Sequence, residues 1–122
     1  KNMNREIKFR AQRTDTKEFV YGYYHEVEAE GVGYSYIFWQ GNTIPVRADS
    51  VGQFTGKLDD NRKEIYEGDI VVDIIGNHYL VEWNDDTCKY QLYDGSDLND
   101  NDRYGTYLVV IGNVYENKKL IN

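Results

Sequence analysis

Two histidines and one cysteine are the side chains of this 122-residue sequence best suited to catalysis or metal binding. An imidazole next to Cys88 would activate its thiol as a nucleophile. However, His25, His78 and Cys88 lie far apart in the sequence, and no His-x-x-x-His or Cys-x-x-Cys pair provides a zinc-binding spacing. An enzyme would need His25 or His78 to meet carboxylates in a cleft. We therefore predict no catalytic residue, cofactor or metal, and expect Cys88 to be buried in a strand.

The acidic segment 94–103 has the oxygen-rich composition of a calcium-binding loop. Calcium loops of the EF-hand type need oxygen ligands at their first, third, fifth and twelfth positions. Placing Asp100 and Asp102 first and third puts Tyr104 fifth and Ile111 twelfth. The spacing therefore fails, and we interpret the segment as a solvated acidic loop.

A second group of candidates consists of residues suited to recognition. They are Gln53, Thr55, Tyr66, Asp69, Trp83, Asn113 and Tyr115. They form either a binding surface or a buried hydrogen-bond network that joins the two halves of the chain, because buried polar groups must be paired. For Asp69, which follows Gly68, the structural interpretation is a carboxylate that caps a turn. Gly56 and Gly68 are expected to adopt positive φ.

Charge and aromatic content limit the class of partner. Lysine and arginine number 14 and aspartate and glutamate 21, so the net charge is 14 − 21 = −7. This balance argues against sequence-independent nucleic-acid binding, which depends on cations that neutralise phosphates. The twelve tyrosines suit half-buried strands, and we expect some of them to form an exposed aromatic patch.

Alternation of apolar and polar residues predicts strands along most of the chain. The first hairpin is expected from Ile7–Gln12 and Phe19–His25, with Phe19, Tyr21 and Tyr23 on one face. Further strands are predicted over these stretches: Tyr34–Trp39, Thr43–Arg47 with Pro45 at a sheet edge, Ile70–Ile75, His78–Trp83, Cys88–Tyr93 and Tyr107–Ile111. A tight turn at Gly76-Asn77 is expected to join two of them.

The fold is therefore expected to be all-β, with at most one or two short helical turns. No segment of ten residues has a helical period. We expect residues 1–48 to form an antiparallel sheet packed on an SH3-like barrel over residues 49–122, together one compact unit. One cysteine excludes an intramolecular disulfide, and no apolar run is long enough to span a membrane. These features predict a cytoplasmic protein.

Four stretches of the sequence resemble the YopX family of bacteriophage and prophage proteins. They are Arg5–Ala11, Gln53–Val71, Tyr79–Trp83 and Val110–Asn117, in the order expected for the family. The chain departs from the family pattern at Gln12 and Arg62. The resemblance implies an all-β fold with an SH3-like C-terminal part and a phage or prophage origin. It implies no activity, substrate or catalytic residue.

These observations favour a non-enzymatic binding module that acts on a host or phage protein through an aromatic and acidic surface. The alternative is nucleic-acid binding, in which Tyr36, Trp39 and Trp83 would stack on bases. That alternative requires the few basic residues to lie on one face, including the clusters Lys8, Arg10, Arg13 and Lys57, Arg62, Lys63. Open strand edges would also allow the chain to form a homo-oligomer.

Overall fold

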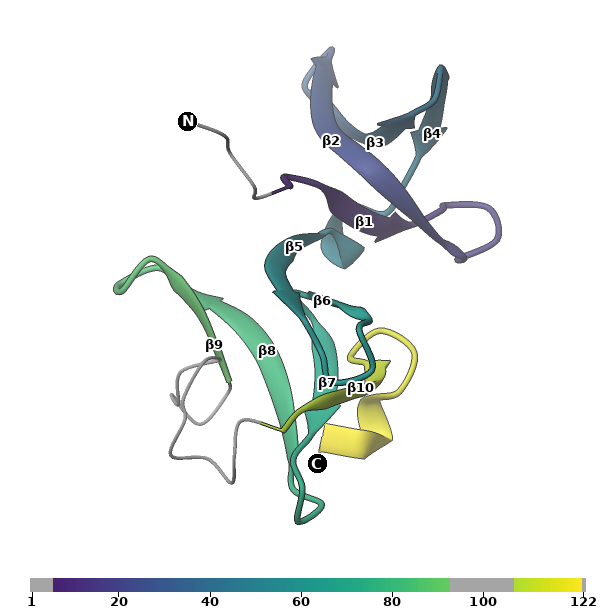
Figure 1. Ribbon diagram of the computed structural model, residues 1–122. Coiled ribbons are helices and arrows are strands. Elements are labelled where there is room, and N and C mark those ends of the chain that lie inside the picture. Colours follow the sequence, from purple (N-terminus) through teal and green to yellow (C-terminus); the bar gives the residue numbers. More distant parts are fainter. Residues whose placement is uncertain (1–5, 93–106, 122) are drawn as a thin grey trace. The chain divides into compact units, whose positions relative to one another are not determined.

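A computed structural model describes residues 6–92 and 107–121 as an all-β protein (Figure 1). The all-β class predicted from the sequence is confirmed. The chain divides into two compact units, Lys1–Phe54 (unit 1) and Thr55–Asn122 (unit 2). In the described part of the chain, no helix is long and apolar enough to cross a membrane. The acidic segment 94–103 lies outside the described residues.

Unit 1 is an antiparallel meander whose last strand returns to the first. Its elements are β1 (Phe9–Gln12), β2 (Phe19–Ala29), β3 (Val32–Trp39), β4 (Asn42–Pro45), the 3-10 helix η1 (Ala48–Ser50) and the first part of β5 (Gly52–Leu58). The strand order is β4-β3-β2-β1-β5. Pro45 therefore lies on an edge strand, as predicted, because proline cannot donate a ladder hydrogen bond.

The core of unit 1 lies on one side of this meander. Ala11, Ile37 and Val46 are buried, and Phe9, Val20, Tyr24, Ile44 and Val51 pack against them. An isolated bridge between Arg13 and Val46 joins the end of β1 to the residue that follows β4. This bridge curls the sheet around its core, because it brings the two ends of the meander together.

In unit 2, as in unit 1, the last strand pairs with an earlier strand of the same unit. Its elements are the second part of β5, β6 (Glu64–Tyr66), β7 (Asp69–Val72), β8 (His78–Asn84), β9 (Lys89–Leu92), β10 (Val109–Asn113) and the 3-10 helix η3 (Lys118–Ile121). β5 pairs with β6, and the other strands follow the order β10-β7-β8-β9. The pairing of β10 with β7 shifts register between Val110 and Gly112, which marks a β-bulge or irregularity in β10.

Two carboxylates hold β10 in place in unit 2. Asp59, in the turn after β5, accepts a hydrogen bond from the Val110 amide at 2.9 Å, and Asp60 accepts one from the Leu108 amide at 2.7 Å. Leu108 is buried in the core together with Ile65, Val71, Val81 and Leu92. The turn after β5 thus fixes where the chain enters its last strand.

Three local expectations were wrong. β7 ends at Val72 and does not continue to Ile75, and a five-residue loop over 73–77 replaces the tight turn at Gly76-Asn77. The Asp73 carboxylate causes the difference, because it accepts hydrogen bonds from the amides of Ile75 and Asn77. Cys88 is exposed instead of buried, since it lies in the turn before β9 with a φ of 56°.

Candidate functional site

The β2–β3 hairpin of unit 1 presents a row of aromatic and apolar side chains to solvent. We define the aromatic face by these residues: Tyr21, Tyr23, His25 and Val27 of β2, and Val32, Tyr34, Tyr36 and Phe38 of β3. Tyr23 is 58% exposed, Tyr34 46% and Phe38 42%. Large apolar side chains scattered singly on a surface need no explanation, but a contiguous group is informative.

Strand register explains why these side chains share one face. Tyr23 pairs with Phe38 and His25 with Tyr36, and residues paired across antiparallel strands project to the same side. The intervening residues, among them Tyr24 and Ile37, project to the other side and belong to the core. Near Tyr24 and Ile37 both faces of the hairpin carry large apolar side chains, and the core covers only the face of Tyr24 and Ile37, so the aromatic face stays exposed.

Ring contacts order the aromatic face. The rings of His25 and Tyr36 have centroids 5.7 Å apart, and those of Tyr23 and Trp39 are 6.1 Å apart. Gly22 lets the strands approach closely at this point, because a Cβ there would lie 2.5 Å from the Phe38 carbonyl oxygen. Within the face, the His25–Tyr36 contact restricts both rings, and an ordered ring loses less conformational entropy on binding than a mobile one.

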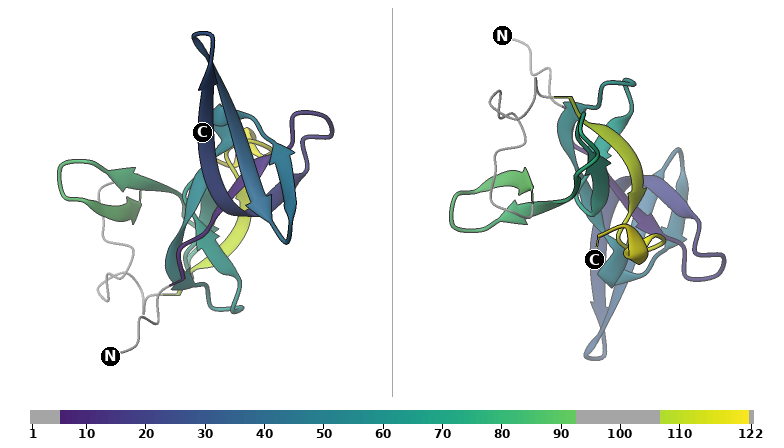
Figure 2. Two further views of the ribbon diagram at one scale, coloured as in Figure 1. Left: turned by 90° about the horizontal axis from the view of Figure 1, so that it is seen from above. Right: turned by 90° about the horizontal axis from the view of Figure 1, so that it is seen from below.

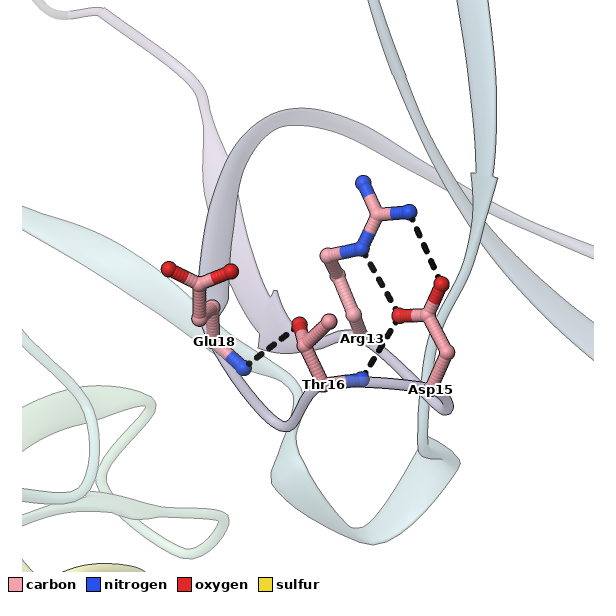
Figure 3. Close-up of polar contacts among 4 residues, drawn as sticks. All are labelled: Arg13, Asp15, Thr16 and Glu18. Atoms are coloured by element: carbon pink, nitrogen blue, oxygen red, sulfur yellow. Dashed lines mark hydrogen bonds and ion pairs between the residues drawn. The ribbon is translucent and has the colours of Figure 1, made fainter.

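Three cations of unit 1, Lys8, Arg10 and Arg13, make contacts within the chain. Arg10 is buried and lies 4.7 Å from the centre of the Phe19 ring, and Lys8 lies 3.5 Å from a Glu6 carboxylate oxygen. Arg13 donates two hydrogen bonds to Asp15, at 2.9 and 3.0 Å (Figure 3). All three cations of the Lys8, Arg10 and Arg13 cluster that nucleic-acid binding would use therefore have partners within the chain.

The Arg13 contact also changes the titration of Asp15. The hydrogen bond from Arg13 lowers the pKa of Asp15 from 3.8 to about 2, and the pKa of Arg13 is raised in return by the same contact. The Thr16 amide donates to the same carboxylate (Figure 3). Asp15 thus stays charged well into the acidic range and closes the β1–β2 turn.

Most of the recognition candidates in unit 2 have partners within the chain. Asp69 is buried, and its carboxylate accepts a hydrogen bond from the Tyr66 backbone amide at 2.7 Å, as the capping interpretation predicted. The Tyr66 hydroxyl donates to Glu64, and the Thr55 hydroxyl donates to the Ile65 carbonyl. Gly56 and Gly68 have φ values of 88° and 93°, so positive φ is confirmed at both.

The motif near the end of the chain forms a turn around Gly68. Asn113 accepts hydrogen bonds from the amides of Tyr115 and Glu116, and its own amide donates to Asn117. The Tyr115 ring packs so closely on Gly68 that a Cβ there would lie 2.9 Å from it. Asn113 thus closes the turn after β10, and Tyr115 packs on Gly68.

The remaining two candidates lie elsewhere. Trp83 is 41% exposed, and its ring contacts Tyr90 edge-on at 5.0 Å. Gln53 lies in unit 1, where it is half-buried and pairs with Phe9. The seven candidates therefore divide among three places, and Trp83 is the one with a largely exposed side chain.

The side chains with catalytic potential are dispersed. His25 lies against Tyr36 in unit 1, whereas His78 of unit 2 contacts the Leu120 carbonyl through Nδ1 at 2.6 Å. The Cys88 thiol faces the Asp85 carbonyl. Among residues 6–92 and 107–121, no group of three or more His, Cys, Asp or Glu side chains is placed to hold a metal ion.

The sequence predicted an exposed aromatic patch without locating it. A usable signal was present, since adjacent apolar residues such as Tyr23-Tyr24 and Ile37-Phe38 place large side chains on both faces of a hairpin. Such doubling means that one row stays exposed unless a second layer covers it. The depth of the core that decides between the rows is a property of the tertiary structure.

Comparisons with known proteins support these assignments at the level of fold and family. The chain resembles the crystal structure of protein EF1440 from Enterococcus faecalis, with a TM-score of 0.58 and 21% sequence identity over 98% of this chain and 100% of that one. No curated protein matches the sequence. The YopX protein family matches residues 8–122, nearly the whole chain, and the chain therefore belongs to the YopX family.

Proposed function

We propose that this protein is a non-enzymatic binding module that contacts a protein partner through the aromatic face of unit 1. The observation that supports this most directly is the exposure of Tyr23, Tyr34 and Phe38 on the same sheet face, where Tyr23 and Phe38 are cross-strand neighbours. Tyrosine and phenylalanine are enriched in protein interfaces. Full burial of one such side chain contributes about 1.5–3 kcal/mol, so a few of them suffice for specific binding.

The setting that we propose follows from the family. The YopX resemblance implies a phage or prophage origin, so the partner would be a host or phage protein in the cytoplasm of the host cell. The strand order of unit 2 supports an SH3-like barrel in the C-terminal part, because β10 returns to pair with β7 after the β7–β8–β9 meander.

Site-specific photo-crosslinking tests the proposed surface directly. A benzophenone side chain in place of Tyr23 is expected to form an adduct with one protein partner in cells that produce the chain. The same group in place of Trp83 is the matched control, since both rings are exposed but lie in different units. Adducts of equal yield at both positions, or none at Tyr23, would contradict the proposal.

Substitution of the aromatic face gives the complementary measurement. We expect Tyr23→Thr with Phe38→Thr to weaken binding of the crosslinked partner at least tenfold, because two buried rings are lost. Threonine preserves strand propensity, so the thermal midpoint should change little. Trp83→Thr should leave the affinity unchanged, and an equal loss for that variant would move the binding surface to unit 2.

A further inference from the structure

The far end of the β2–β3 hairpin is a two-stranded ribbon that lacks a neighbouring strand. β1 pairs with β2 only as far as Gly22, and β4 pairs with β3 only from Tyr36 onward. In the part of the chain that the structure describes, no other strand pairs with residues 25–34, which we call the arm. The tip of the hairpin extends beyond the other strands of unit 1 (Figure 2).

Such a ribbon gains from an added strand. Every residue of the arm is exposed, including Val27, Val32 and Tyr34. A two-stranded antiparallel pair is only marginally stable in water, and a third strand or a covering layer is needed for independent stability. An extended segment of another protein can supply that strand through main-chain hydrogen bonds.

The β3 side of the arm has the backbone groups to accept such a segment. The Ser35 carbonyl accepts a hydrogen bond from the Val46 amide at 3.0 Å, so the backbone groups of Ser35 face away from β2. Backbone groups of successive residues point to opposite sides of a strand, so residues two apart point to the same side. The N–H and C=O of Gly33 therefore also face away from β2. After Val46 the chain leaves this row, since the Arg47 amide donates to the Gln12 carbonyl of β1.

A hollow of about 240 Å³ lies beside this edge. Its lining includes Thr14, Gly33, Tyr34, Tyr36, Pro45 and Ala48. Two aromatic rings, a proline and an alanine methyl group make a surface suited to an apolar side chain. The hollow lies where β4 leaves the sheet, so a strand that continues the row of β4 would place a side chain in it.

The opposite side of the arm determines the charge of the added strand. Glu28 pairs with Gly33, and Glu26 pairs with Ser35. A Cβ on Gly33 would have no heavy atom within 4 Å. With strands about 4.8 Å apart, the Glu28 side chain can therefore pass over Gly33 to a lysine or arginine on the next strand.

A second copy of the arm does not supply the basic residue that Glu28 would meet. Residues 25–34 contain three glutamates and no lysine or arginine. Charge complementarity therefore selects a basic segment over another arm.

We propose that the Gly33 edge of the arm binds an extended segment of the partner protein in which apolar residues alternate with lysine or arginine. This inference rests on the proposed function. The segment pairs with β3 as a third strand. Its apolar residues lie with Val32 and Tyr34 and fill the hollow, and a basic residue opposite Gly33 faces Glu28.

Selection from random 12-residue peptides displayed on phage particles tests this inference with the whole chain as bait. We expect the enriched peptides to alternate apolar and basic residues. The best synthetic peptide should bind about tenfold more weakly to Glu28→Lys, whereas Glu18→Lys, the same charge change in the β1–β2 turn, should bind it normally. Failure to enrich such peptides, or equal weakening by both variants, would overturn the inference.

A backbone variant tests the strand pairing itself. Gly33→Pro removes the outward N–H, and proline is tolerated on an edge whose N–H faces solvent, so the β2–β3 ladder should persist. Peptide binding should be lost, while the ring contact of His25 and Tyr36 in NMR spectra reports an intact hairpin.

The two proposals can fail separately. If Tyr23→Thr with Phe38→Thr abolishes partner capture but Gly33→Pro and Glu28→Lys do not, the proposed function stands and the edge inference fails.

Discussion

At the scale of single residues, Asp73 decides the shape of the β7–β8 loop. Its carboxylate accepts hydrogen bonds from two amides, from the Asn77 side chain and from the Tyr79 hydroxyl at 2.8 Å. Burial raises the pKa of Asp73 and these hydrogen bonds lower it, with a pKa below the ordinary value as the outcome. The apolar run over 70–75 predicted a longer strand, since alternation does not register a side chain that captures the backbone.

Asp73→Ala should lower the free energy of unfolding by about 2 kcal/mol at pH 7, because the loop amides and the Tyr79 hydroxyl lose their charged acceptor. Urea unfolding measures the loss, and Asp86→Ala in an exposed turn is the control. A folded-state pKa below the unfolded value stabilises the protein above about pH 4, and the benefit disappears as the pH falls through the folded pKa. The difference between wild type and Asp73→Ala should therefore shrink in acid, and a constant difference would contradict this assignment.

The Arg13–Asp15 pair allows a direct titration. Replacement of Arg13 by glutamine should raise the pKa of Asp15 from about 2 toward 3.8, since the Arg13 hydrogen bond is the largest cause of its depression. A carbon-detected NMR titration of the carboxyl group measures the change. The stabilising contribution of Asp15 is present above the unfolded pKa and is lost as the pH falls toward 2. No movement of the pKa in Arg13→Gln would assign the depression to the Thr16 amide.

At the scale of elements, hairpins and strand faces were predictable, and turn geometry was predictable only in part. The alternation of Phe19, Tyr21 and Tyr23 located one face of β2, and Pro45 located an edge. Cys88 was misplaced because its neighbours suit a strand, whereas a backbone φ of 56° places it in a turn. Gly56 and Gly68 were predictable because glycine is the residue for which positive φ carries no steric cost.

A comparison of alanine substitutions at Gly68 and Gly76 distinguishes steric crowding from backbone strain. Gly68 and Gly76 have nearly equal φ values, 93° and 95°, but a Cβ would meet Tyr115 at Gly68 and no heavy atom within 4 Å at Gly76. Gly76→Ala should therefore cost about 1 kcal/mol, whereas Gly68→Ala should cost about 2–3 kcal/mol. Thermal unfolding of both variants measures the difference, and equal losses would show that Tyr115 yields to the added methyl group.

At the scale of the whole molecule, charge and aromatic surface belong to different units. Unit 1 has seven cationic and seven acidic residues, 7 − 7 = 0, and unit 2 has seven and fourteen, 7 − 14 = −7. The binding surface expected from the sequence combined both properties. Composition averages over the chain, so the separation of the two properties was visible only after the unit boundary was known.

This charge distribution predicts how the protein behaves toward DNA. Duplex DNA should show no electrophoretic shift at 50 mM salt, because unit 1 is neutral and unit 2 is acidic. A shift that weakens steeply with added salt would favour the nucleic-acid alternative. In that case a Lys57→Glu variant tests whether the cluster of Lys57, Arg62 and Lys63 in unit 2 contacts the phosphates. Loss of the shift in this variant would place the DNA contact at that cluster.

The returning strands of the two units have a consequence for the order of events during synthesis. In unit 1, β5 is synthesised after its partner β1, so the sheet can close once residue 54 has left the ribosome. In unit 2, β7 cannot pair with β10 until residues 109–113 have been made, and Asp59 and Asp60 cannot accept hydrogen bonds from the Val110 and Leu108 amides before then. On the ribosome, the arm with its open edge would thus be available to a partner while the neighbouring unit was still incomplete.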